Sequence, residues 1–295
     1  MMPDPGYLFD LHLHTNYSDG RPSPEEVVRH CAGARLAAIA ITDHENANGM
    51  RAAAPFARRL EIELIPGIEF SCRWEGGRKF GINESDIDLL GYFFNPEDPA
   101  FMSLENAALE DLHHRIGACC ERISQAGYPI HMEEVLEQNP HYGGAMALID
   151  ALVKKGLAPD WRAASLLFET HWSKVSSNWL TIQQAIHAIH AAGGVAVLAH
   201  PSVIRTYRGW LRARPIAELV KAGLDGLEIY HPRLTEEARK HFTALAVRFH
   251  LLVTGGSDEH GWPEGFPRLG SQPVTISMVE SLRERSRHYR SAIEE

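Results

Sequence analysis

Histidine and carboxylate side chains stand in or just after most of the short apolar runs of this sequence. The first run, residues 9–13, contains His12 and is followed by His14. Residues two apart in a β-strand point to the same face, so two imidazoles with this spacing can bind one metal ion. The other runs contain or precede Asp43, His44, Glu69, Asp88, His200, His231, Asp258 and His260. Together these side chains have the chemistry of a divalent metal site that hydrolyses its substrate.

A single H-x-H pair does not establish a metal site, because a strand with two surface histidines has the same sequence. The repetition of the pattern favours a metal site. Buried charges are costly unless they are paired or bound to a metal, so a histidine or carboxylate at nearly every strand end has no simple structural explanation. In a parallel barrel the carboxyl ends of the strands open on one face, where residues far apart in sequence meet.

The elements that must position these residues follow an α/β pattern. Continuous apolar runs at 37–42, 195–199 and 251–255 are typical of buried parallel strands, and helical segments separate the runs. Between residues 96 and 180 helical periodicity dominates, and no strong strand run occurs. We therefore predict an α/β barrel formed by residues 1–95 and 181–295, with residues 96–180 inserted into it as a helical subdomain.

The composition limits the class of protein. The chain has 295 residues, 44% of them hydrophobic, and a formal net charge of −9, which argues against an extended nucleic-acid surface. No run approaches the ~20 apolar residues of a membrane span. The four cysteines lack metal-ligand spacing, and two of them are adjacent. We therefore expect a reduced, cytoplasmic protein rather than a disulfide framework.

The motifs taken together resemble those of the PHP (polymerase and histidinol phosphatase) family. The resemblance rests on His12-x-His14 with Asp19, Thr42-Asp43-His44, Gly67-Ile68-Glu69, Ala199-His200-Pro201 and Ser257-Asp258-x-His260. It covers nearly the whole chain apart from the helical segment. The most similar branch is that of small stand-alone members with a helical insert, which includes nucleoside 3′,5′-bisphosphate phosphatases. The resemblance implies a distorted (β/α)7 TIM-like barrel that holds two or three divalent ions.

The resemblance also implies a role for each matched residue. The expected metal ligands are His12, His14, Asp19, His44, Glu69, Asp88, His200, Asp258 and His260. Glu69 is expected to bridge two ions, and Asp19, His44 and His260 are expected to hold the third. The expected catalytic residues are Asp258, Glu69 and His200, around a hydroxide that bridges metals in the family.

Charge explains how such a centre would attract a phosphate ester. Three divalent ions bring about six positive charges against four carboxylates, which leaves roughly two positive charges inside an acidic protein. Bound ions also lower the pKa of water to about 7 and stabilise a transferring phosphoryl group, so no serine or cysteine nucleophile is needed. Manganese, iron and zinc are the expected metals, and magnesium is an alternative. Asp43 is expected either to orient a ligand histidine or to cap a turn.

Two departures from the family pattern limit what the resemblance says about the substrate. Asp88 stands where the family usually has histidine, which would favour Mn, Fe or Mg over Zn or leave the second site weak. Related phosphatases grip a second phosphate with an Arg-x-His segment in the insert, where this chain has Ala145 and Ala147. Other basic residues then become candidates for binding phosphate, with placement on the solvent-exposed surface as the alternative for each. They are Arg205, Lys174, His171 and Arg233.

We predict a phosphoric ester hydrolase that acts on a phosphomonoester, either a nucleotide or a small sugar phosphate. One alternative is a hydrolase of cyclic phosphates or other phosphodiesters, or an exoribonuclease, on the same metals. The other is a non-catalytic PHP module with a degraded second metal site. The expected partner is a small phosphorylated molecule rather than a membrane, and the sequence does not specify the metals, the exact substrate or the oligomeric state.

Overall fold

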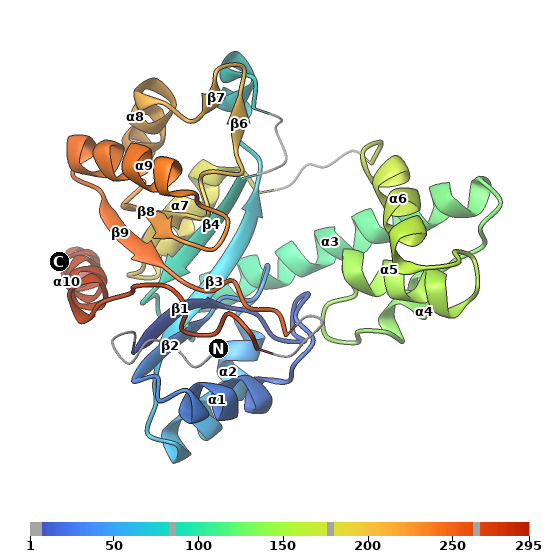
Figure 1. The fold of residues 1–295 in the computed structure, drawn as a ribbon, viewed down its shortest axis with the longest axis horizontal. Helices are drawn as coiled ribbons and strands as arrows, with labels where there is room; N and C mark the ends of the chain where they lie inside the picture. The colour runs from blue at the N-terminus through green and yellow to red at the C-terminus, as the bar shows by residue number, and fades with distance from the viewer. Residues whose placement is uncertain (1–7, 83–86, 176–179, 262–265, 295) are drawn as a thin grey trace.

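The structure is a computed structural model that describes residues 8–82, 87–175, 180–261 and 266–294. Seven strands in this part of the chain form one curled sheet in the order β1-β2-β3-β4-β5-β8-β9 (Figure 1). They are β1 (Phe9–Leu13), β2 (Ala38–Ile41), β3 (Glu63–Cys72), β4 (Ile87–Tyr92), β5 (Val195–Leu198), β8 (Gly226–Tyr230) and β9 (Leu252–Gly255). Leu13 forms a parallel bridge with Glu259, just beyond β9. The first and last strands therefore come together, and the predicted distorted barrel is confirmed.

Strand β4 runs against its neighbours, which corrects the expectation of an all-parallel barrel. It pairs antiparallel with both β3 and β5, whereas the other pairs in the sheet are parallel. A parallel connection needs a crossover of a dozen or more residues, usually a helix. The described part of the β3–β4 connection holds the short 3-10 helix η1 (Glu75–Phe80). Because β4 is reversed, Asp88 lies near its start and still reaches the face where β3 and β5 end.

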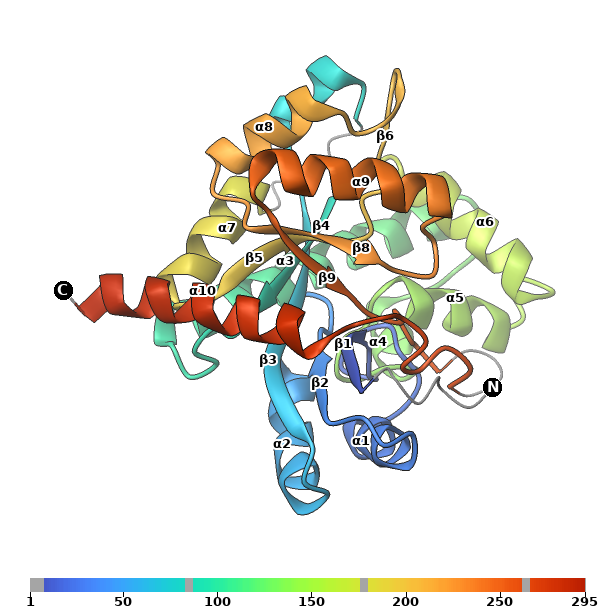
Figure 2. The same ribbon diagram turned by 60° about the vertical axis from the view of Figure 1, so that its left-hand side comes forward.

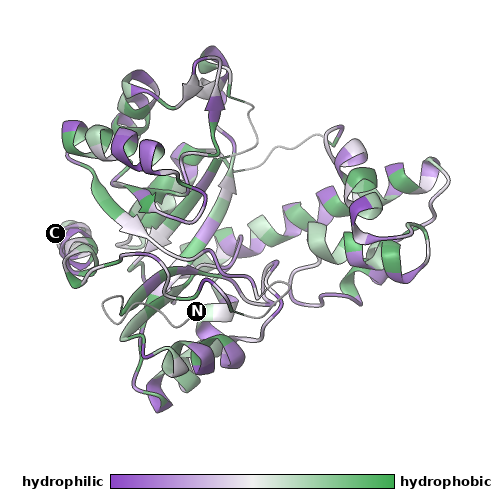
Figure 3. Ribbon diagram, in the orientation of Figure 1, coloured by the Kyte–Doolittle hydropathy of each residue, from purple (hydrophilic) through white to green (hydrophobic). Residues whose placement is uncertain are grey.

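Helices cover the outside of the sheet (Figure 2). They are α1 (Pro24–Gly33), α2 (Asn48–Arg59), α7 (Ile182–Ala191), α8 (Ala213–Lys221), α9 (Glu236–Phe249) and α10 (Ile276–Glu294). Capping boxes fix two of their starts, with Ser23 and Glu26 on α1 and Thr181 and Gln184 on α7. The strands are largely apolar and the helices are mixed (Figure 3), which matches a sheet buried between helices and a filled barrel interior. A small hairpin, β6 (Arg205–Thr206) with β7 (Gly209–Trp210), follows β5.

Four helices between β4 and α7 project to one side of the barrel (Figure 1). They are α3 (Pro99–Gln125), α4 (Met132–Leu136), α5 (Ala145–Lys154) and α6 (Trp161–Trp172). They have a hydrophobic cluster of their own that includes Leu112 and Phe168. The first turns of α3 belong to the barrel core instead, because Phe101 stacks on Phe94 with 4.4 Å between ring centroids. One long helix thus joins both cores, and the boundaries at 95/96 and 180/181 stay a prediction.

The cysteines and the helices bear on the cellular setting. All four cysteines are buried and none is in a disulfide. Across the described residues, every helix is too short or too polar to cross a membrane.

Candidate metal centre

Side chains from the first and last strands meet at one end of the barrel. His12 Nε2 lies 3.1 Å from both His14 Nε2 and Glu69 Oε2, and His14 Nε2 lies 3.3 Å from the same Glu69 oxygen. Asp258 Oδ1 lies 3.5 Å from His12 Nε2 and 3.4 Å from His14 Nε2. Ligands about 2.1 Å from a tetrahedral ion stand about 3.4 Å apart. These four donor atoms therefore have the spacing of one metal site.

Glu69 connects this group to a second one. Its Oε2 faces His12 and His14, while its Oε1 lies 3.2 Å from His200 Nε2. Asp88 Oδ2 lies 3.7 Å from the same nitrogen of His200, and the three side chains form a second group of donors. A carboxylate that turns one oxygen to each group has the geometry of a bridging ligand. Asp88 is therefore placed where a ligand is expected, although it is not the histidine that the family usually has.

A third group surrounds the carboxylate of Asp19. His260 Nε2 lies 3.1 Å and His44 Nε2 lies 3.9 Å from Asp19 Oδ1, and His14 completes the group. Asp19 Oδ1 is buried and accepts no hydrogen bond of good geometry, although His260 Nε2 lies 3.1 Å away. A buried oxygen without such a partner is costly unless a cation satisfies it, so this group also fits a bound ion.

Burial and opposite charges act against each other in this cluster. Burial alone would lower the pKa of His200 and His260, but Glu69 near the first and Asp19 near the second raise each pKa to about 9. Burial alone would raise the pKa of Glu69 and Asp258, but the charge of His12 helps to hold both far below their usual range. Metal ligands must be deprotonated, so ion binding at these histidines has to release protons.

Two further residues, in β8 and just after it, contact the candidate ligands, and the sequence analysis missed one and only partly recognised the other. Glu228 is fully buried, and its two oxygens meet His12 Nδ1 at 2.9 Å and the backbone N–H of His200 at 2.8 Å. His231 Nε2 lies 3.2 Å from Asp258 Oδ2 and joins His12 and Asp258 in a further donor group. His231 ends an apolar run like the other predicted ligands, so its position was a usable signal. A glutamate inside a buried strand was the signal for Glu228.

Asp43 lies behind His14. Its carboxylate accepts hydrogen bonds from the backbone N–H and the hydroxyl of Thr15, at 2.7 and 2.6 Å, and from the Ser18 hydroxyl. The Ser18 oxygen in turn lies 3.3 Å from His14 Nδ1. Asp43 therefore holds the turn after β1 and contacts His14 only through Ser18, and its role in orienting the ligand stays a prediction.

A cavity of about 350 Å³ lies between the metal centre and the helical insert, and Asp19, His44 and Asp88 border it. The structure does not bring the four predicted phosphate-binding residues to this cavity. Arg205, Arg233 and Lys174 are exposed, His171 is half-buried, and none of the four is among the described residues that line the cavity. Arg115 of α3 is among the described residues that do line the cavity, as is Ala145. Sequence reasoning missed Arg115 because an arginine on a long amphipathic helix normally faces solvent.

Comparison with known proteins agrees with this geometry. The sequence model of the PHP domain matches residues 10–228. Phosphoribosyl 1,2-cyclic phosphate 1,2-diphosphodiesterase of Eggerthella lenta is 29% identical over 88% of this chain and 97% of its own length. A 5′-3′ exoribonuclease of Haemophilus influenzae is 30% identical over 93% and 96% of the two chains. The 3′,5′-nucleoside bisphosphate phosphatase of Chromobacterium violaceum is 30% identical over 88% and 90%.

A solved structure agrees as well. A candidate metal-dependent phosphoesterase of Bifidobacterium adolescentis superposes with a TM-score of 0.80 at 27% identity, over 96% of this chain and 97% of that one. The family match covers well over half of the chain, and it includes the elements that carry most of the candidate ligands. The chain therefore belongs to the PHP domain family and is a metal-dependent phosphoesterase.

Proposed function

We propose that this chain hydrolyses a small phosphomonoester, a nucleotide or a sugar phosphate, with two or three divalent ions. The observation that carries the proposal is the grouping of the nine predicted ligands, whose donor atoms lie within 4.8 Å of one another in each group. The residues that would hold the ions are His12, His14, Asp19, His44, Glu69, Asp88, His200, Asp258 and His260.

When bound, divalent ions lower the pKa of water and stabilise negative charge on a phosphoryl group. The residues of the chain prepare the site for them. His12 and His14 are fully buried, which keeps bulk water from their ring nitrogens. Glu228 accepts the Nδ1 proton of His12, so that Nε2 faces the centre. Asp88 adds an oxygen donor where a histidine is usual, which supports manganese, iron or magnesium over zinc.

The size and charge of the molecule support a small substrate. The relatives described above are named for a cyclic phosphate, for RNA and for a nucleoside bisphosphate, at almost equal identity. Their names therefore do not select a substrate for this chain. The cavity of about 350 Å³ is at the lower end of the range for pockets that enclose one small molecule. The net charge of −9 also disfavours a long polyanion.

We also propose that the protein acts in the cytoplasm. Four buried cysteines without a disulfide support a reducing compartment.

The proposal is tested by metal analysis combined with a substrate panel. The purified chain is loaded with Mn²⁺, Fe²⁺ or Zn²⁺, and its metal content is measured per chain. Nucleoside monophosphates, sugar phosphates, a cyclic phosphate and a short RNA are then compared by phosphate release. We expect two or three ions per chain and the highest kcat/KM for a phosphomonoester. The highest kcat/KM for the RNA or the cyclic phosphate would assign the alternative function.

Single substitutions link the ions to the activity. His12→Ala and Asp258→Ala should each remove bound metal and lower kcat by at least about a thousandfold, because a metal-dependent step has no substitute in the site. His187→Ala replaces an exposed histidine of α7 and serves as the matched control. Full activity in His12→Ala or Asp258→Ala would overturn the assignment of the metal centre.

A further inference from the structure

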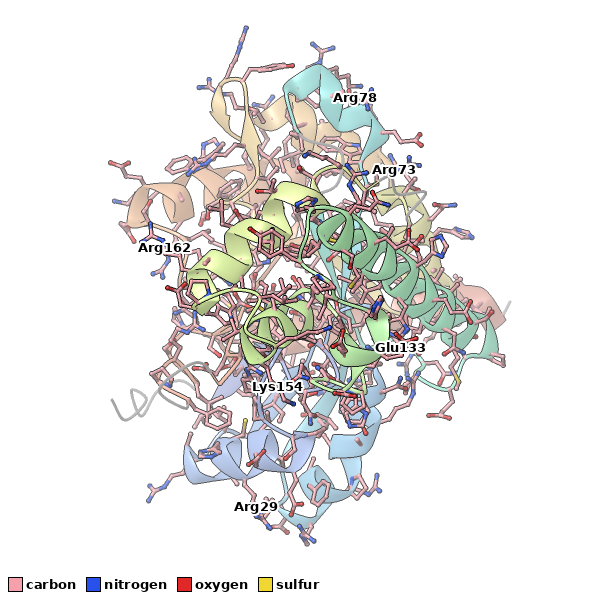
Figure 4. The ribbon with its side chains drawn as sticks, turned by 90° about the vertical axis from the view of Figure 1, so that its right-hand side faces the viewer. Arg29, Arg73, Arg78, Glu133, Lys154 and Arg162 are labelled. Carbon is pink, nitrogen blue, oxygen red and sulfur yellow. The ribbon has the colours of Figure 1, made fainter. Side chains whose placement is uncertain are left out.

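The turn that joins α4 to α5 touches the barrel beside the metal centre. This insert turn, residues 137–144, lies against the β1–α1 loop, residues 15–21. The loop carries Asp19, around which the third donor group forms. Figure 4 looks at the molecule from the insert, with α4 and α5 in front of the barrel and Glu133 and Lys154 labelled on them. The insert therefore reaches a loop that presents a candidate ligand.

The side chain of Asn139 makes the central contact of the insert turn. Its Nδ2 donates to the carbonyl oxygen of Ser18 at 2.8 Å. Its Oδ1 accepts from the backbone N–H groups of His141 and Tyr142, at 3.0 and 3.2 Å. The two accepted bonds fix which end of the amide is the oxygen, so the NH₂ group faces the loop. Asn139 thus folds its own turn and holds the residue before Asp19 with the same side chain.

Two further contacts flank this hydrogen bond. The ring of Tyr17 stacks on that of His141, with centroids 4.0 Å apart and an interplanar angle of 20°. Arg21 Nη2 pairs with Asp150 Oδ2 of α5 at 2.5 Å. The insert therefore holds residues 17, 18 and 21, on both sides of Asp19. The pair between Arg21 and Asp150 is partly exposed and contributes little by itself, so the hydrogen bond and the stacked rings carry the contact.

The space behind Asp19 is not filled by side chains. A polar cavity of about 150 Å³ lies between the β1–α1 loop and the insert, and Asp19, Asn139 and Asp150 are among the described residues that line it. Close packing therefore does not fix Asp19 from that side. The polar contacts of its neighbours hold the loop there instead.

The position of the β1–α1 loop matters for two candidate ligands. The Ser18 hydroxyl lies 3.3 Å from His14 Nδ1, and Asp19 Oδ1 lies 3.1 Å from His260 Nε2. Gly20 lies so close to the backbone of His14 that an added Cβ would stand 2.7 Å from its carbonyl carbon. A shift of the loop would therefore separate Asp19 from His260 and disturb His14 as well.

We propose that Asn139, together with His141, positions Asp19 for the third ion. The insert turn then completes a metal site whose ligands all belong to the barrel. The inference rests on the proposed metal centre, and it gives the insert a role that does not depend on contact with substrate. Asn139 is a positioning residue, because it acts on Asp19 through the neighbouring Ser18.

The barrel itself offers the competing explanation. The backbone N–H of Arg21 donates to the carbonyl oxygen of His260 at 2.9 Å, and that of Asn16 donates to the carbonyl oxygen of Pro22 at 2.8 Å. If these bonds alone hold the loop, loss of the insert contacts leaves metal binding unchanged. If the insert turn is required, the affinity for one ion falls while the other ions stay bound.

Asn139→Asp tests the hydrogen bond alone. The aspartate still accepts from the turn, but it faces the Ser18 carbonyl with an oxygen instead of an NH₂ group. Its added negative charge would favour a cation, so weaker binding cannot come from charge. The affinity for the ion that Asp19→Ala fails to bind should fall by about three- to tenfold, the range for one hydrogen bond. Gln138→Glu makes the same change of charge where the side chain bonds to Glu134 within the insert, and it should stay within about twofold of wild type.

His141→Ala tests the stacked rings. It should lower the same affinity by about two- to tenfold, the range for an aromatic pair. The double variant Asn139→Asp/His141→Ala should lower it by about six- to a hundredfold, the product of the two ranges. His114→Ala, at an exposed position of α3, is the matched control and should leave the affinity unchanged.

Binding is measured with Mn²⁺ alone, by competition with a fluorescent chelator and by metal content after dialysis at several Mn²⁺ concentrations. Wild type should bind one ion more than Asp19→Ala. When Asp19→Ala is combined with the double variant, the remaining ions should bind as strongly as in Asp19→Ala alone, because the insert turn acts through Asp19. A general folding defect would weaken those ions too, and each single variant gives the same comparison with a smaller risk of misfolding.

Three results would overturn the inference. They are a double variant that binds every Mn²⁺ within about twofold of wild type, an equal loss of affinity for every ion, and an Asp19→Ala variant that binds as many ions as wild type. The first two leave the metal centre in place, and none of the three depends on which ester is cleaved. Failure of the proposed phosphomonoesterase reaction is therefore seen separately, in the substrate panel.

Discussion

Replacing Glu228 with glutamine tests whether the metal centre depends on a buried carboxylate behind its first histidine. Glu228 accepts two hydrogen bonds, one from the ring Nδ1 of His12 and one from the backbone N–H of His200. Both contacts belong to elements that present ligands to the centre. Burial would raise the pKa of Glu228, but the charges of His12 and His231 lower it. The side chain is therefore ionised and accepts with both oxygens.

A glutamine of the same shape can accept only one of these two bonds. In either orientation its NH₂ group faces an N–H donor, of His12 or of His200, and one buried donor loses its partner. An unsatisfied buried donor costs about 1–3 kcal/mol. Loss of a residue that orients a metal-binding histidine lowers metal affinity by about 10–100-fold. Since a tenfold change corresponds to about 1.4 kcal/mol, the two ranges agree. We expect Glu228→Gln to weaken Mn²⁺ binding by about 10–100-fold.

The affinity is measured by competition between the protein and a fluorescent chelator, and activity is measured against Mn²⁺ concentration. Glu228→Gln should need more Mn²⁺ but recover most of its activity at saturation, because the ligands themselves remain. Glu237→Gln, an equal change of charge at an exposed position of α9, is the control. Glu228→Gln with a native melting temperature and an Mn²⁺ affinity within about twofold of wild type would refute the reasoning.

Three further predictions test other parts of the molecule. The pKa values of His200 and His260 are raised to about 9, so protons compete with metal at these two side chains. The Mn²⁺ affinity should therefore rise between pH 7 and 9 and then level off. An affinity that does not change with pH in metal titrations would contradict this. Asp225, just before β8, is buried and accepts hydrogen bonds from His190, Arg285 and Tyr289. Asp225→Ala should therefore lower the free energy of unfolding in urea by about 3 kcal/mol. A decrease of less than about 1 kcal/mol would contradict the contacts. Asp88→His should raise the Zn-to-Mn ratio of protein dialysed against both ions, and an unchanged ratio would show that Asp88 is not a ligand.

The sequence predicted that the candidate ligands come together because these residues stand at or near strand ends. His12 and Glu69 lie in β1 and β3, and His200 and Asp258 follow β5 and β9, so a barrel was enough to bring the four together. No side-chain detail was needed for that inference, since the carboxyl ends of neighbouring parallel strands meet by topology alone. Asp88 also reached the centre, although for a different reason, because the antiparallel direction of β4 puts its start at that face.

The parts that the sequence did not predict depend on packing between distant elements. Glu228 looks like an interruption in an apolar strand until His12 is placed across the barrel from it. Arg115 looks like a solvent-facing residue of α3 until α6 brings Trp172 beneath it. In both cases the sequence gives the type of residue, but the contact depends on how two elements pack, which periodicity does not report.

The candidate metal ligands and the helical insert stand on separate parts of the fold. The metal groups stand on strand ends, where a change of a few tenths of an ångström would disturb several ligands at once. The start of α3 packs into the barrel core, where Phe101 stacks on Phe94, and the rest of the insert has a hydrophobic cluster of its own. Residues such as Arg115 and Trp172 can therefore change without moving His12 or Asp258. We therefore expect substitutions at Arg115 and Trp172 to leave metal binding unchanged, whereas substitution of Asp88 should change which ion is bound.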